Sequence, residues 1–219
     1  MEMLKIANIN KKYGDKVVLQ DFNLQIEENK ITVILGESGS GKTTLLNVIS
    51  GLTDYQGEVE GINGNEISFV FQQNRLVDCL TVKNNLKLAL PSITEQEIEN
   101  MLDSLGIKDA LNLYPKSLSA GMARRVAIAR ALLKKCSLML MDEPLINLDL
   151  ALKLKVINLI KYGHSVAPVT TVIVTHDLKE AVMLANRIIV LSNGKIIYDN
   201  SNIGDQTEQE LFDLLSKQG

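Results

Sequence analysis

The sequence predicts an α/β fold with a mixed, mainly parallel sheet, an N-terminal antiparallel β-subdomain and an inserted α-helical subdomain. Three patterns carry this prediction. Residues 31–35 form a short apolar, β-branched run, and a glycine-rich loop and a helically spaced segment at 44–50 follow it. That is the order of a buried parallel strand, a tight turn and a covering helix. Helical spacing then dominates residues 81–135, and strand-like and helical segments alternate after residue 136.

The N-terminal segments have the alternation of half-exposed strands. Residues 3–10 alternate apolar and polar side chains, and residues 17–26 do so again after the turn signal Gly14-Asp15. This pattern predicts an antiparallel sheet. Two further strands are expected at 57–62 and 67–71, separated by the turn-forming residues 63–65.

The block from about residue 81 to 135 is predicted to be helical. One helix is expected at 81–90, Thr94 and Glu97 form a capping box that opens a second, and Ser119 caps a third at 120–134. The chain is therefore expected to be one domain over residues 1–219. Its core would comprise 1–80 and 136–219, and residues 81–135 would form the helical subdomain.

The β/α alternation resumes after this block. Strands are expected at 138–141, 171–174, 187–191 and 196–198, and helices at 150–161, 178–185 and 207–216. Residues 192–195 form a hairpin turn signal between the last two strands. Strands that alternate with helices favour a parallel sheet covered on both faces.

Composition excludes several classes of protein. The chain has 219 residues, 46% of them hydrophobic, and a net charge of −3 without a basic block, so a nucleic-acid partner is not expected. Cys79 and Cys136 are too few for a disulfide framework and fit a reducing compartment. No secretory leader and no run of about 18–20 apolar residues is present, which predicts a cytoplasmic location.

The loop at residues 36–43 carries the clearest chemistry. Its sequence, Gly-Glu-Ser-Gly-Ser-Gly-Lys-Thr, matches the phosphate-binding pattern G-x-x-x-x-G-K-[ST] between the expected strand and helix. Glycines let successive N–H groups surround phosphates at the positive end of a helix. Lys42 can reach the β- and γ-phosphates, and the Thr43 hydroxyl can bind Mg²⁺. The core is therefore predicted to be that of a P-loop NTPase.

A second carboxylate-bearing segment completes the predicted site. Leu138-Met-Leu-Met141 leads into Asp142, which can hold Mg²⁺ at the end of a buried strand. Glu143 follows directly and can polarise an attacking water as a general base. The alternative is that both carboxylates merely end the strand before Pro144.

Several motifs together resemble the nucleotide-binding subunits of ATP-binding cassette (ABC) transporters, nearly from end to end. They are Tyr13, the loop Gly36 to Thr43, Gln72 after Phe69-Val70-Phe71, the signature-like Leu118-Ser119-Ala120-Gly121-Met122, the segment 125–132, Asp142-Glu143, Asn147-Leu148-Asp149 and Thr175-His176-Asp177. Ala120 and Met122 depart from the family's Leu-Ser-Gly-Gly-Gln.

The resemblance implies roles for these residues. Glu143, His176 and Gln72 would be catalytic, and Thr43, Gln72 and Asp142 would hold Mg²⁺. Tyr13 would stack on adenine, although it could also be an ordinary aromatic residue at a strand edge. The expected ATP contacts are Tyr13, Gly36, Glu37, Ser38, Gly39, Ser40, Gly41, Lys42, Thr43, Thr44, Ser119, Gly121 and Asp149. His164 lies outside these motifs and is expected to be solvent exposed.

The same resemblance implies partners. Two chains would meet head to tail, as a homodimer that encloses two MgATP, and would dock on separate membrane permease subunits at the inner face of the membrane. Residues 74–82 resemble importer ATPases for nitrate, sulfonates or taurine. A soluble ABC ATPase with an assembly role and a degenerate regulatory cassette are the alternatives.

Overall fold

The computed structural model describes residues 4–61 and 66–216, and it contains two β-sheets and seven α-helices within these ranges. The predicted turn at 63–65 and position 62 of the strand expected before it lie outside the described residues. Among the residues described, no helix combines the length and apolar character needed to cross a bilayer. The predicted α/β class, with a mainly parallel sheet and a separate antiparallel sheet, is confirmed.

The smaller sheet is antiparallel and has the strand order β2-β1-β4. Its strands are β1 (Leu4–Tyr13), β2 (Lys16–Ile26) and β4 (Gln56–Glu60). Alternate side chains of β1 and β2 are buried, as the alternating pattern predicts.

The larger sheet has the strand order β5-β6-β7-β3-β8-β9. Its strands are β5 (Ile67–Val70), β6 (Leu138–Asp142), β7 (Thr170–Thr175), β3 (Ile31–Leu35), β8 (Arg187–Ser192) and β9 (Lys195–Asn200). All neighbouring pairs are parallel except β8 and β9, which form the predicted hairpin. Strands β3, β6 and β7 are buried on both faces, which explains why, apart from Asp142, their residues are apolar or threonine and show no polar alternation.

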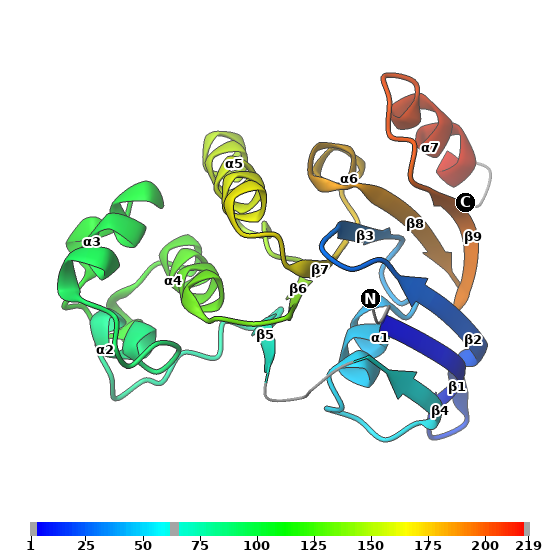
Figure 1. The fold of residues 1–219 in the computed structure, drawn as a ribbon, viewed down its shortest axis with the longest axis horizontal. Coiled ribbons are helices and arrows are strands. Elements are labelled where there is room, and N and C mark those ends of the chain that lie inside the picture. The colour runs from blue at the N-terminus through cyan, green and yellow to red at the C-terminus, as the bar shows by residue number, and fades with distance from the viewer. Residues whose placement is uncertain (1–3, 62–65, 217–219) are drawn as a thin grey trace.

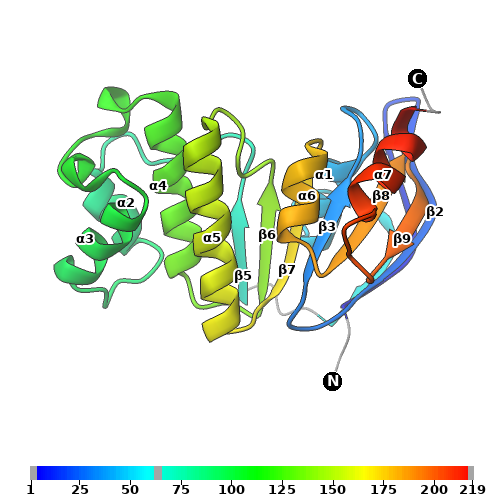
Figure 2. The same ribbon diagram turned by 90° about the horizontal axis from the view of Figure 1, so that it is seen from above.

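Two hydrophobic cores cover the two faces of the larger sheet. Helix α1 (Lys42–Ile49) lies between the two sheets, and its leucines pack with β1, β2 and β3 (Figure 1). The opposite face is covered by helices α4 (Ala120–Leu133), α5 (Leu150–Val166) and α6 (Leu178–Leu184), and α7 (Thr207–Ser216) lies over the β8–β9 end (Figure 2). Helices α2 (Val82–Lys87) and α3 (Glu95–Ser104) pack with α4 at one end of the molecule (Figure 1).

Two helix starts follow the predicted caps. Thr94 and Glu97 form the capping box of α3, and the Ser119 side chain accepts a hydrogen bond from the third residue of α4. Helix α2 is shorter than the expected 81–90 and ends at Lys87, since Pro91 disfavours helical backbone just before it. Helix α5 continues past the expected residue 161 to Val166, and Pro168 follows its end.

Candidate functional site

The loop at residues 36–43 requires glycine at three positions. Gly39 and Gly41 have φ angles of +86° and +109°, which L side chains rarely adopt. A Cβ on Gly36 would lie 2.3 Å from the carbonyl oxygen of Leu191. Helix α1 starts at Lys42, so the loop ends at the positive end of a helix. This backbone is suited to surround a phosphate chain.

Lys42 lies inside this loop, with 6% of its surface exposed. Its Nζ donates hydrogen bonds to the carbonyl oxygens of Gly36 (2.7 Å) and Glu37 (2.8 Å). Burial lowers the pKa of Lys42, although the carboxylates of Glu143, Asp142 and Glu37 oppose that shift. The buried Ser40 Oγ has no hydrogen-bond partner among the described residues. Both groups can donate hydrogen bonds to phosphate oxygens, so the loop fits the phosphates of a nucleoside triphosphate.

The register of three neighbouring strands brings the other predicted residues to this loop. Asp142 at the end of β6 pairs with Val174 of β7, and Leu35 at the end of β3 pairs with Thr175. The carboxyl ends of β3, β6 and β7 therefore meet at one edge of the sheet, where ligands of open α/β sheets bind. His176 follows β7 directly at that edge.

Asp142 and Thr43 form the candidate Mg²⁺ site. Thr43 Oγ1 donates a hydrogen bond to Asp142 Oδ1 over 3.2 Å, and Asp142 is 3% exposed. Burial raises the pKa of Asp142, an effect that the Thr43 hydrogen bond and the positive charges of Arg124 and Lys42 only partly offset. A carboxylate and a hydroxyl beside a phosphate-binding loop are oxygen ligands of the kind Mg²⁺ takes.

Glu143 and His176 are in direct contact. His176 Nδ1 lies 2.9 Å from Glu143 Oε2 and 3.0 Å from Oε1. Because a carboxylate only accepts hydrogen bonds, this geometry requires the imidazole hydrogen on Nδ1. Glu143 has a φ of +48°, a strained backbone for a non-glycine residue, and is 9% exposed. The pair can orient a water molecule next to the loop.

Part of this set lines one cavity of about 420 Å³, while Asp142 and His176 lie behind it, in contact with Thr43 and Glu143, and Gly36, Glu37 and Ser40 do not line it. Its lining includes Tyr13, Lys16, Val18, Ser38, Gly39, Gly41, Lys42, Thr43, Thr44, Gln72 and Glu143. The Tyr13 ring is 49% exposed, and the Lys11 ammonium lies 4.6 Å from its centroid. An aromatic ring at the rim of a cavity lined by a phosphate-binding loop offers a face on which a base can stack.

Ser119, Gly121 and Asp149 do not line this cavity. Ser119 Oγ accepts from the Met122 N–H (3.2 Å) at the start of α4, and Asp149 Oδ1 accepts from the Leu152 N–H (3.0 Å) at the start of α5. The two helix starts are close, since a Cβ on Gly121 would lie 3.3 Å from the Asn147 carbonyl oxygen. Ser119 and Asp149 are exposed. They are thus available to a second chain rather than to the cavity of their own chain.

Sequence reasoning missed Arg124. This residue of α4 is 2% exposed, and its guanidinium reaches the backbone on both sides of the cavity edge, at residues 71–72 and 142–144. Burial lowers its pKa to about 10, and the charges of Asp142 and Glu143 oppose that shift. The sequence feature that could have identified it is an arginine within an apolar helix, because a charged side chain is rarely buried without a specific partner.

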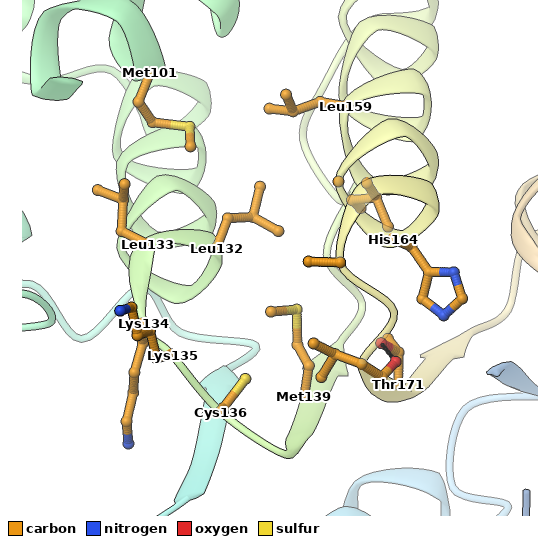
Figure 3. Close-up of a pocket in the computed structure, with 14 residues that line it drawn as sticks. Met101, Leu132, Leu133, Lys134, Lys135, Cys136, Met139, Leu159, His164 and Thr171 are labelled. Carbon is orange, nitrogen blue, oxygen red and sulfur yellow. Dashed lines mark hydrogen bonds between the residues drawn. The ribbon is translucent and has the colours of Figure 1, made fainter. Parts of the chain in front are cut away.

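A second cavity, of about 380 Å³, lies between α4 and α5 and is mainly apolar (Figure 3). None of the predicted site residues lines it. His164, which does, corrects an expectation: it is half-buried rather than solvent exposed, and its Nε2 is buried. Burial lowers its pKa. The extension of α5 beyond residue 161 explains this, because it places His164 within the helix and above the end of the sheet.

Comparisons with known proteins agree on one family. A model of the family described as ABC transporter matches residues 19–146. The aliphatic sulfonates import ATP-binding protein SsuB 1 of Paracoccus denitrificans is 41% identical over 197 residues, which cover 89% of this chain and 81% of that protein. The sulfate/thiosulfate import ATP-binding protein CysA of Synechocystis is 38% identical, over 87% of this chain and 58% of that protein.

Two solved structures have the same fold. One is the dimeric structure of MJ0796, a bacterial ABC transporter cassette, and the other is its post-hydrolysis state bound to ADP and Pi. Each has a TM-score of 0.81 and 32% sequence identity, over 92% of this chain and 100% of the other.

Proposed function

The chain belongs to the ABC transporter family, and from this membership we propose that it is the ATP-hydrolysing subunit of an importer. It binds and hydrolyses ATP and powers transport through separate membrane permease subunits. One observation supports this most: Lys42, Thr43, Gln72 and Glu143 line a single cavity, beside Asp142 and His176. The relatives named above are import ATP-binding proteins, which supports the direction of transport.

Each of these residues has its own role in the in-line attack of water on the γ-phosphate. Lys42 and the loop N–H groups hold the phosphates, and Tyr13 stacks on adenine. Thr43, Gln72 and Asp142 would hold Mg²⁺, and when bound the ion would neutralise charge on the phosphates. Glu143 takes the proton of the attacking water. As the imidazolium, His176 donates from Nδ1–H to Glu143 and from Nε2–H to the γ-phosphate, and so orients both groups.

The dimer is head to tail and contains two copies of this chain. Ser119 and Gly121 at the start of α4 donate to the γ-phosphate bound by the other copy, and Asp149 lies beside them. The exposure of Ser119 and Asp149, and the absence of all three residues from the cavity of their own chain, support this assignment. Each site is complete only when both chains close around the nucleotide.

Met122→Gln is expected to tighten this closure. Met122 is half-buried against the apolar core and offers no amide to the second chain's ATP. One added hydrogen bond contributes about 0.5–1.5 kcal/mol, so the apparent ATP affinity should rise by roughly 2- to 10-fold. ATP-dependent dimerisation followed by light scattering measures this. Ala120→Gly, which adds no donor, is the control, and an unchanged affinity in Met122→Gln would contradict the idea.

The permease partner also sets the location, at the inner face of the membrane. Residues 73–86, after Gln72 and into α2, are the proposed docking segment. An affinity capture from detergent-solubilised native membranes tests the whole proposal, with Glu143→Gln as bait in the presence of MgATP. Recovery of a polytopic membrane protein supports the transporter function. Recovery of soluble partners alone, with a bait that still dimerises on ATP, would instead favour a soluble ABC ATPase.

A further inference from the structure

Arg124 joins two separate segments of the backbone at the edge of the site. On one side its guanidinium donates to carbonyl oxygens at the end of strand β6 and just after it: Asp142 (2.7 Å), Glu143 (2.6 Å) and Pro144 (2.9 Å). On the other side it donates to those that follow β5: Phe71 and Gln72 (3.3 Å). One side chain thus holds the backbone of both Glu143 and Gln72.

We propose that Arg124 is a positioning residue for hydrolysis, which ties Glu143 and Gln72 to helix α4 as one unit. The inference rests on the proposed function, because it concerns the same water-activating residues. Arg124 touches only their backbone, so it acts through them and not on the nucleotide.

The chemistry of arginine suits this task. A planar guanidinium directs its N–H donors into a fixed fork, so one group can hold acceptors in two segments at once. A lysine ammonium is a compact charge on a flexible stem and lacks that fork. The Arg124 side chain is 2% exposed, and no carboxylate oxygen lies within 4.0 Å of it among the described residues. Its burial is therefore compensated mainly by the backbone carbonyls, with Asn74 Oδ1 (3.4 Å) as a side-chain acceptor.

The backbone that Arg124 holds needs this support. Glu143 has a φ of +48°, a conformation that costs of the order of 1–3 kcal/mol and persists only when its surroundings fix it. Three backbone contacts do so: its N–H donates to the Val174 carbonyl (3.0 Å), and its carbonyl accepts from the Ile146 N–H (3.2 Å) and from Arg124. Without Arg124, the Glu143 backbone would keep its contact to β7 and the local turn contact to Ile146, but it would lose its tie to helix α4.

The same contacts couple the two nucleotide sites of the proposed dimer. Arg124 lies five residues after Ser119 on α4, about 7.5 Å along the helix axis. When the second chain's nucleotide engages the start of α4, a shift of that helix moves the Arg124 guanidinium with it. Glu143 and Gln72 of the same chain then move too, so binding at one site prepares hydrolysis at the other.

Three variants of the purified full chain test this. Arg124→Met removes the fork and keeps the volume, and Arg124→Lys keeps the charge. Arg130→Met is the matched control, since Arg130 also lies on α4 and donates to the backbone after Gln72, at Arg75 (2.9 Å) and Asn74 (3.2 Å), but not to residues 142–144. Turnover, its Hill coefficient for ATP, ATP affinity without hydrolysis and the melting temperature are measured for each.

The expected result separates positioning from general support. Arg124→Met should lose about 100-fold in turnover and the ATP cooperativity, with ATP affinity within threefold of the original. Arg124→Lys should recover less than a tenth of the lost turnover while it melts close to the original chain. Arg130→Met should retain turnover within threefold, whatever its melting temperature.

Two results overturn the inference. One is full turnover and cooperativity in Arg124→Lys. If Arg124→Met fails to fold, the Arg124→Lys variant alone tests the inference. The other is an equal loss of turnover in Arg130→Met, which would reduce Arg124 to general anchoring of α4. If the unaltered chain itself hydrolyses no ATP, the proposed function fails first.

Discussion

Glu143→Gln is expected to lower ATP turnover by about 1,000-fold while ATP binding is retained. Glutamine keeps the size of the side chain and an oxygen that accepts from His176 Nδ1–H, but it cannot take the proton of the attacking water. General base catalysis contributes about 10²–10⁴-fold in rate. Phosphate release and equilibrium binding of a fluorescent ATP analogue measure the two effects separately.

The same variant should accumulate as an ATP-bound dimer, because closure no longer ends in hydrolysis. Size-exclusion chromatography with MgATP detects that species. Glu208→Gln on α7, an exposed carboxylate outside the cavity, controls for the loss of one negative charge. Undiminished hydrolysis in Glu143→Gln would remove Glu143 from the role of base.

Lys42→Met is expected to weaken ATP binding by about 100-fold. The Lys42 ammonium is the buried cation of the loop, and its bonds to the Gly36 and Glu37 carbonyls can be exchanged for phosphate oxygens. Hydrogen bonds to charged groups contribute about 1.5–3 kcal/mol each, and two such bonds suffice for the loss.

Thermal stabilisation by ATP gives a direct readout of this loss. At 100 times the dissociation constant, ATP stabilises the original chain by about 2.7 kcal/mol, and at the same concentration the variant gains only about 0.4 kcal/mol. For a chain of this size, that difference is a melting-temperature rise of roughly 5–9 °C that Lys42→Met lacks. Lys12→Met, an exposed lysine of β1, is the control. An equal rise in Lys42→Met would show that the loop does not need its lysine.

Local sequence patterns predicted most of the fold. The apolar runs at β3, β6 and β7 identified buried parallel strands, because only a strand covered on both faces lacks polar alternation. The capping box at Thr94 and the hydroxyl at Ser119 located helix starts, since a cap satisfies N–H groups within one turn. Helix ends were predicted less well: α2 stops before Pro91 and α5 continues to Val166, just before Pro168, because apolar periodicity does not show where a proline ends a helix.

The candidate site, like the fold, could be predicted in part from local sequence. The sequence by itself determined the chemistry: a glycine-rich loop with Lys42 and Thr43, a carboxylate pair at 142–143 and a histidine at 176, each encoded in a short contiguous motif. Motifs of this kind can be recognised from sequence because their residues act next to one another along the chain.

Only the tertiary structure decided which of these motifs share a cavity and what holds them. The register of β3, β6 and β7 brings Asp142 and His176 to the loop, and that register depends on contacts between residues up to about 140 positions apart. Arg124 emerged only there, because its partners at 71–72 and 142–144 are remote in sequence from one another and carry backbone carbonyls that every residue has. Every residue has a backbone carbonyl, so the sequence of the partner segments does not show that a side chain binds them. The role of Arg124 can therefore be identified only from the folded structure.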